Sequence, residues 1–131
     1  MAIRTRGLNH LTVRVSHLEQ SVRFYEQLLG FYVRHRGEHD AYLESGPLWL
    51  ALIEGDVPLG ETQSRHVDHI ALTVAAGEFD DAVEALHAAN VTIVAGPITR
   101  GVGRSVYFLD PDGLQLELHT STLDARMSVW S

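Results

Sequence analysis

The period of the hydrophobic pattern changes along the chain, and the same order of periods occurs twice. From Leu8 to Val15 apolar and polar residues alternate, which is typical of a half-buried strand. Apolar residues then recur at helical spacing: Leu18, Val22, Tyr25, Leu28 and Leu29. Three more strand-like segments follow, at 31–35, 41–44 and 48–53. The first half of the chain therefore predicts a βαβββ unit.

The second half repeats this plan. An alternating segment at 67–74 precedes a helix face marked by Phe79, Val83 and Leu86. Strands are predicted at 91–94, 105–109 and 114–119, with a strong turn signal at 110–113. Residues 55–65 lack periodicity and are predicted to be a linker. We expect one α+β domain, 1–131, built from modules 7–54 and 66–120 that share a continuous sheet, since neither module buries much alone.

Local signals predict the ends of both helices. Ser16 followed by Glu19 has the spacing of a capping box, so Ser16 is the predicted N-cap. Gly30 and Asn90 stand where a residue in the left-handed conformation would end each helix.

Composition narrows the possible partners. The 131 residues carry a formal charge of −7, with no basic run, which argues against a nucleic-acid partner. Without cysteine the chain has no disulfide and no thiolate ligand or nucleophile, so a metal would need nitrogen and oxygen ligands. No signal peptide and no membrane-spanning run is recognisable, so we expect a cytoplasmic protein without a membrane partner.

Three residues on the more polar strand faces are candidate metal ligands. His10 and His69 occupy the third position of matching strands in the two repeats, and Glu117 lies on the last strand. Two imidazoles and one carboxylate suit a divalent first-row metal that keeps open positions for water or substrate. Aligning 49–53 with 115–119 sets Ala51 against Glu117, so the pseudo-equivalent fourth position has no ligand. The remaining histidines lack this support and are expected on the surface or around the site.

These features resemble the vicinal oxygen chelate superfamily, which includes glyoxalase I, extradiol dioxygenases and fosfomycin resistance proteins. Within it the chain is most similar to the fosfomycin resistance metalloenzymes. The resemblance rests on GLNHLTV at 7–13, SVRFYEQLLGF at 21–31, AYLESGPLWLAL at 41–52, DHIALTV at 68–74, and GRSVYFLDPDG with LELHTSTLDAR within 103–126. The FYxxLLGF and FLDPDG pieces occur across the superfamily, whereas the strand around Trp49 and the stretch from Arg104 to Arg126 are more specific.

The resemblance implies a paired-sheet cup in a domain-swapped homodimer, with His10 from one chain and His69 and Glu117 from the other. The metal would be Mn(II), with Fe(II), Zn(II), Ni(II) or Co(II) as alternatives, and glutathione would open the epoxide of fosfomycin. Matched positions imply phosphonate or substrate contacts from a set of hydroxyl and cationic residues: Thr12, Ser105, Tyr107 and Arg126. Tyr42 and Trp49 match the entrance used by the thiol or substrate.

The chain departs from the glutathione-transferring pattern in one loop. Pro97 and Gly101 stand where those enzymes carry a lysine and a serine, which argues against potassium activation. Arg100 or Arg104 would then supply the missing positive charge. Asp40, nine residues before Trp49, matches the carboxylate base of the hydrolytic members.

Three functions remain open at this point. The first is opening of fosfomycin by glutathione or by water, with Thr12 and Asp40 in catalytic roles. The second is a dioxygenase, isomerase or lyase reaction on an endogenous metabolite, because the same ligand set serves Fe(II) oxygenases. The third is a non-catalytic protein that binds a drug.

Overall fold

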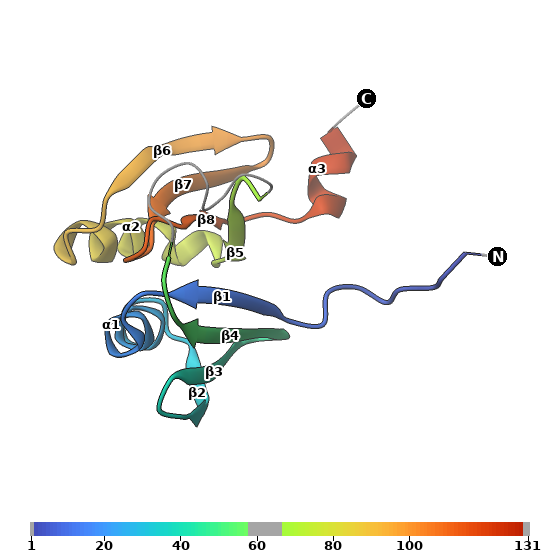
Figure 1. The fold of residues 1–131 in the computed structure, drawn as a ribbon. Helices are drawn as coiled ribbons and strands as arrows, with labels where there is room; N and C mark the ends of the chain where they lie inside the picture. The colour runs from blue at the N-terminus through green and yellow to red at the C-terminus, as the bar shows by residue number, and fades with distance from the viewer. Residues whose placement is uncertain (1, 58–66, 130–131) are drawn as a thin grey trace. The chain divides into compact units, whose positions relative to one another are not determined.

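The computed structural model describes residues 2–57 and 67–129, which form two compact units, Met1–Val57 and Pro58–Ser131. Each unit contains one four-stranded sheet and few helices, which confirms the predicted α+β class (Figure 1). The prediction of one continuous sheet shared by the two modules is wrong, because the described residues form two separate sheets. Most of the predicted linker, 55–65, lies outside the described residues.

The N-terminal unit has the predicted βαβββ order. Its elements are β1 (Leu11–Val15), α1 (Leu18–Arg23), the π-helical η1 (Phe24–Leu28), β2 (Tyr32–Arg36), β3 (Asp40–Ser45) and β4 (Leu48–Glu54). The strand order is β1-β4-β3-β2, with β1 parallel to β4 and the other pairs antiparallel.

The C-terminal unit repeats this topology. Its elements are β5 (Ile70–Thr73), the 3-10 helix η3 (Ala76–Glu78), α2 (Phe79–Ala88), β6 (Ile93–Arg100), β7 (Gly103–Leu109), β8 (Gln115–His119) and α3 (Leu123–Val129). The order β5-β8-β7-β6 has one parallel pair, β5 with β8, as β1 pairs with β4. The internal repeat read from the sequence is therefore a structural repeat.

Each unit has its own apolar core between its sheet and its helices. In the N-terminal unit, strand residues such as Leu43 and Leu52 are fully buried with Tyr25 of η1. In the C-terminal unit, Phe108 of β7 is buried with Phe79 of α2. Because side chains alternate across a strand, burying these residues turns the intervening polar ones to the opposite face.

The helix ends are predicted correctly except at one position. Gly30 and Asn90 have φ of +76° and +57°, which confirms the left-handed residues expected there. The prediction of Ser16 as N-cap of α1 is wrong, because His17 is the N-cap and no side chain of the cap residue closes the helix. Instead, the backbone N–H of Leu18 donates to Glu54 Oε2 at 2.8 Å, a partner 36 residues away. That carboxylate satisfies a free N–H of the first turn.

Strand and helix boundaries differ from the sequence prediction at four places. β1 and β5 begin directly after His10 and His69, so both histidines precede their strands instead of lying within them. β6 runs on to Arg100, well beyond the predicted end at 94. Its register with β7 shifts between Ile93 and Ala95 and again between Ala95 and Ile98, and the second shift spans Pro97, which suits proline in an edge strand. α3 was not predicted. No helix in the described part of the chain is long and apolar enough to cross a membrane.

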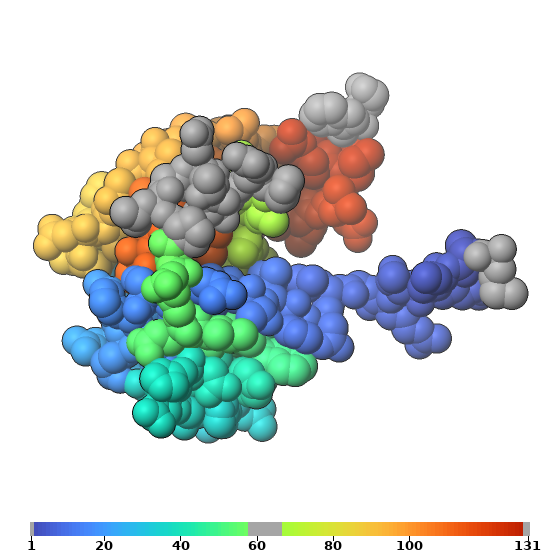
Figure 2. All heavy atoms as spheres, viewed as in Figure 1, coloured from blue at the N-terminus to red at the C-terminus, as the bar shows by residue number. Residues whose placement is uncertain are grey.

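The chain before β1 is extended. Residues 2–10 are exposed, and Figures 1 and 2 show the first part of this segment running away from the sheet of its own unit. His10 lies at its inner end, beside the start of β1.

Candidate metal centre

The two candidate histidines occupy equivalent places in the two sheets. Leu11 pairs with Leu50 at the start of β1, and Ile70 pairs with Leu116 at the start of β5. Each histidine immediately precedes the first paired residue of a parallel strand, and so lies at the end of its ladder. The matching registers confirm that the two halves align as the sequence repeat predicts.

Both imidazoles are oriented by the residue before them. Asn9 Oδ1 lies 2.7 Å from Nδ1 of His10, and Asp68 Oδ2 lies 2.7 Å from Nδ1 of His69. An oxygen acceptor at Nδ1 favours a proton on that nitrogen and leaves Nε2 as the nitrogen for a metal, the arrangement typical of metal-ligating histidines. The same ring nitrogen is therefore available in both halves.

His69 and Glu117 face one another directly. Nε2 of His69 lies 2.9 Å from Oε1 of Glu117, whose side chain is only 8% exposed. Oε2 of Glu117 accepts a hydrogen bond of 2.5 Å from the buried Ser105 hydroxyl. An imidazole nitrogen and a carboxylate oxygen that converge in this way suit a divalent cation.

The equivalent place in the N-terminal unit holds a methyl group. Thr12 pairs with Ala51, and Ala71 pairs with Glu117, two positions after each histidine. Ala51 is therefore the structural counterpart of Glu117, as the sequence alignment predicts. Among the described residues, neither unit alone gathers three His, Cys, Asp or Glu side chains that could hold a metal ion. The C-terminal unit supplies two donors of the expected set.

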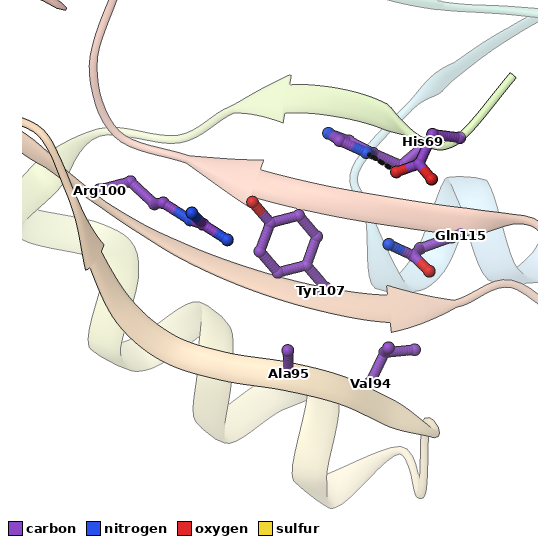
Figure 3. A pocket seen from close by; sticks show the side chains of 7 residues that line it. His69, Val94, Ala95, Arg100, Tyr107 and Gln115 are labelled. Carbon is purple, nitrogen blue, oxygen red and sulfur yellow. Dashed lines mark hydrogen bonds and ion pairs between the residues drawn. The ribbon is translucent and has the colours of Figure 1, made fainter.

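A pocket of about 220 Å³ opens beside His69 (Figure 3). Its lining residues come from the strand starts and the β6–β7 hairpin: Asp68, His69, Val94, Ala95, Arg100, Tyr107 and Gln115. The Tyr107 ring meets the His69 ring edge-on, with centroids 5.4 Å apart, and the Arg100 guanidinium lies 5.8 Å from the Tyr107 centroid. The structure thus brings together three residues that the sequence had singled out separately. Gln115 and Asp68 were missed, although Gln115 shares the polar strand face of Glu117.

The other predicted cations lie apart from this pocket or at its edge. Arg104 donates to Asp80 Oδ1 at 2.8 Å, and its guanidinium carbon lies 4.5 Å from the Phe79 ring centroid, on the α2 side of the sheet. The structure therefore directs Arg100, and not Arg104, toward Tyr107 and His69. Arg126 of α3 packs over Gly101, the residue after Arg100, because a Cβ at Gly101 would lie 2.9 Å from Arg126 Cδ.

In the N-terminal unit, the aromatic ring of Trp49 packs against His10. The rings of His10 and Trp49 have centroids 4.3 Å apart, and Trp49 and Tyr42 are in edge contact at 5.6 Å. Tyr42 and Trp49 line a second pocket, of about 240 Å³, with Arg34, Leu43 and Glu44. Asp40 lies on the strand face of Tyr42, with Oδ1 3.2 Å from His35 Nε2 and its side chain 42% exposed.

Comparisons with known proteins show which family this chain resembles. Residues 7–118 match the family model described as the Glyoxalase/Bleomycin resistance protein/Dioxygenase superfamily. The chain is 41% identical over 127 residues to glutathione transferase FosA of Serratia marcescens, covering 94% of this chain and 86% of that protein. It is 38% identical over 127 residues to metallothiol transferase FosB of Lysinibacillus sphaericus, covering 95% and 89%. This chain belongs to the glyoxalase/bleomycin resistance/dioxygenase superfamily.

Among solved structures, the fosfomycin resistance protein FosX of Listeria monocytogenes, in complex with Mn(II) and sulfate, superposes with a TM-score of 0.84. It is 27% identical in sequence and covers 98% of this chain and 100% of that one. A variant of the same FosX was solved with Mn(II) and 1S,2S-dihydroxypropylphosphonic acid, at a TM-score of 0.84 and 28% identity. The two-sheet architecture described above is thus the fold of this superfamily, and the similarity to fosfomycin resistance proteins extends over nearly the whole chain.

Proposed function

We propose that this chain is a metal-dependent enzyme that inactivates fosfomycin by opening its epoxide with a thiol, glutathione. The observation that carries the proposal is the pair formed by His69 Nε2 and Glu117 Oε1, 2.9 Å apart, beside a pocket that contains Tyr107 and Arg100. The similarity to a glutathione transferase and to metallothiol transferases supports a thiol as nucleophile.

The proposed ligands of the divalent metal are His10, His69 and Glu117. The C-terminal unit supplies His69 and Glu117, so the third donor comes from elsewhere, and we assign it to His10 of the partner subunit in a homodimer. Mn(II) is the proposed metal, because the similar FosX was solved with it. When bound, the metal acts as a Lewis acid that stabilises the alkoxide formed as the epoxide C–O bond breaks.

Cationic and hydroxyl side chains bind and orient the substrate in this proposal. A phosphonate is recognised by guanidinium groups, which offer several N–H donors in a fixed plane. Arg126 and Arg100 flank Gly101 in the β6–β7 turn and supply that charge, while Tyr107 and Thr12 donate hydroxyl hydrogen bonds. The aromatic pocket of Tyr42 and Trp49 borders His10 and is the proposed approach of the thiol.

Hydrolysis is the second candidate reaction, with Asp40 as the base that activates water. Two observations favour it. Asp40 is a half-exposed carboxylate held next to His35 on the strand face of Tyr42, and the similar FosX variant was solved with a dihydroxypropylphosphonic acid, the product type that water addition gives. A carboxylate that accepts a proton from water is a standard general base.

Phosphorus NMR of the product tests both reactions. The purified protein is loaded with Mn(II) and incubated with fosfomycin alone, with glutathione and with L-cysteine. A new phosphonate signal that appears only with glutathione supports the proposed reaction. A signal that forms without thiol and disappears in Asp40→Asn supports hydrolysis instead. No new signal in any tube contradicts both. We expect the enzyme to act in the cytoplasm, where the glutathione pool is kept reduced.

A further inference from the structure

A chain of three side chains runs across β7 and β8 and ends on Glu117. Ser105 of β7 lies directly opposite His119 of β8 in the antiparallel register, and Tyr107 lies opposite Glu117. All four residues therefore share one face of the sheet. Ser105 Oγ is 2.5 Å from Glu117 Oε2 and 2.8 Å from His119 Nδ1.

Counting donors fixes the direction of this chain. A serine hydroxyl has one hydrogen to donate, and an ionised carboxylate only accepts. The Ser105 hydrogen therefore goes to Glu117, at a distance typical of a hydroxyl bonded to a charged oxygen. Ser105 Oγ must then accept from His119, which requires the proton of that imidazole on Nδ1. The direction is His119 to Ser105 to Glu117.

Burial makes the loss of either hydrogen bond costly. Ser105 is fully buried and Glu117 is 6% exposed, so water does not replace a lost partner. Gly103 lets the segment that follows β8 approach closely, since a Cβ there would lie 2.8 Å from Ser121 Cβ, 3.0 Å from Thr120 Oγ1 and 3.2 Å from His119 Cε1. His119 itself keeps a quarter of its side chain exposed.

We propose that Ser105 and His119 are positioning residues that hold Glu117 Oε2 and leave Oε1 as its metal-binding oxygen. Oε1 is the atom that faces His69 Nε2, so the carboxylate binds through one oxygen and keeps coordination positions open for substrate. Groups that orient a ligand in this way contribute strongly to metal affinity. The inference rests on the proposed metal centre. It also replaces the predicted role of Ser105 as a phosphonate donor, because its one hydrogen is already used.

Metal binding by designed variants tests this hydrogen-bonded chain of side chains. The Kd for Mn(II) is measured by the EPR signal of the free ion in the wild type, Ser105→Ala, His119→Leu and His119→Asn. Ser105→Ala is expected to weaken binding by about tenfold to a hundredfold. His119→Leu removes one hydrogen bond further from the metal and is expected to weaken it by about tenfold or less. His119→Asn keeps an N–H donor near the Nδ1 position and restores affinity. Ser128→Ala, on α3, is the matched serine control.

The double variant distinguishes positioning from general destabilisation. If His119 acts only through Ser105, adding His119→Leu to Ser105→Ala causes no further loss of Mn(II) affinity. If the two substitutions act independently, their losses of Mn(II) affinity add, which contradicts the hydrogen-bonded chain from His119 through Ser105 to Glu117. In the metal-free protein, the nitrogen-15 shifts of His119 should show a proton on Nδ1, and a ring protonated at Nε2 alone would overturn the inferred direction. Equal Mn(II) affinity of Ser105→Ala and wild type overturns this inference alone, whereas a wild type that binds no Mn(II) overturns the metal centre as well.

Discussion

Replacing Gly101 with alanine tests whether Arg126 acts on the substrate from the position in which the structure holds it. Gly101 has a φ of +60°, and a Cβ there would lie 2.9 Å from Arg126 Cδ and 3.2 Å from Nη1. At the first of these distances the arginine side chain must move. Gly46 is a matched control, because its φ is +56° and no atom of the residues that the structure describes lies within 4 Å of the Cβ it lacks.

The two variants share one effect and differ in another. Alanine in the left-handed region costs about 1–2 kcal/mol at either position. For a protein of this size that lowers Tm by about 3–10 °C. A hydrogen bond from a charged donor contributes about 1.5–3 kcal/mol. If displacement of Arg126 removes about half of that contribution, KM for fosfomycin rises about fourfold to tenfold. We expect that rise in Gly101→Ala only, with kcat little changed.

Initial rates from phosphorus NMR over a range of fosfomycin concentrations give KM, and circular dichroism gives Tm. Arg126→Ala should raise KM at least as much, and Gly101→Ala should add nothing to it in the double variant. If both glycine variants show the same KM while their Tm values fall together, the reasoning about Arg126 is refuted.

Three further changes probe other parts of the molecule. Glu117→Gln should abolish tight Mn(II) binding, and an unchanged metal stoichiometry by atomic absorption would rule out this ligand. Asp40→Asn should remove any diol formed without thiol and spare the glutathione product, whereas an unchanged diol yield would show that Asp40 is not the base. Glu54→Gln probes the cap of α1. The pKa of Glu54 is lowered, first by the hydrogen bond from the N–H of Leu18 and then by the hydrogen bond with His39. The pKa of His39 is raised, first by the hydrogen bond with Glu54 and then by the charge of Glu38. Because the pKa of Glu54 is lowered in the folded protein, this group contributes stability that is lost as pH falls through the carboxylate range. Because the pKa of His39 is raised, this group contributes stability that is lost as pH rises past the ordinary histidine value of 6.5. The Tm difference between wild type and Glu54→Gln should therefore be larger at pH 6 than at pH 8, and a difference that grows with pH would contradict the pairing.

Much of the fold follows from short-range signals. Alternation and helical spacing locate the strands and both main helices, and the left-handed positions at Gly30 and Asn90 follow from residue type alone. The cap of α1 does not, because Glu54 reaches Leu18 from 36 residues away and sequence-local rules favour Ser16. α3 has exposed apolar residues and none that are buried, so its pattern offers no contrast with a loop.

The candidate site also has features that the sequence predicts and features that only the structure shows. The repeat places His10, His69 and Ala51 in register, and the structure reproduces that register. The choice between Arg100 and Arg104 needed the structure, although alternation already separates Arg104 from the face of Ser105 and Tyr107. The bond from Ser105 to Glu117 depends on the pairing of β7 with β8 and on burial, which no motif encodes.

The equivalence of Ala51 and Glu117 has a consequence for how such a chain can evolve. β8, which carries the carboxylate, must keep its face for the metal, while β4, which has alanine at the equivalent position, is free of that requirement. In the N-terminal half the register places Trp49 where the C-terminal half has Gln115, and Asp40 where it has Ser105. The attacking group could therefore change through substitutions in β3 and β4 alone, without disturbing the ligands on β8.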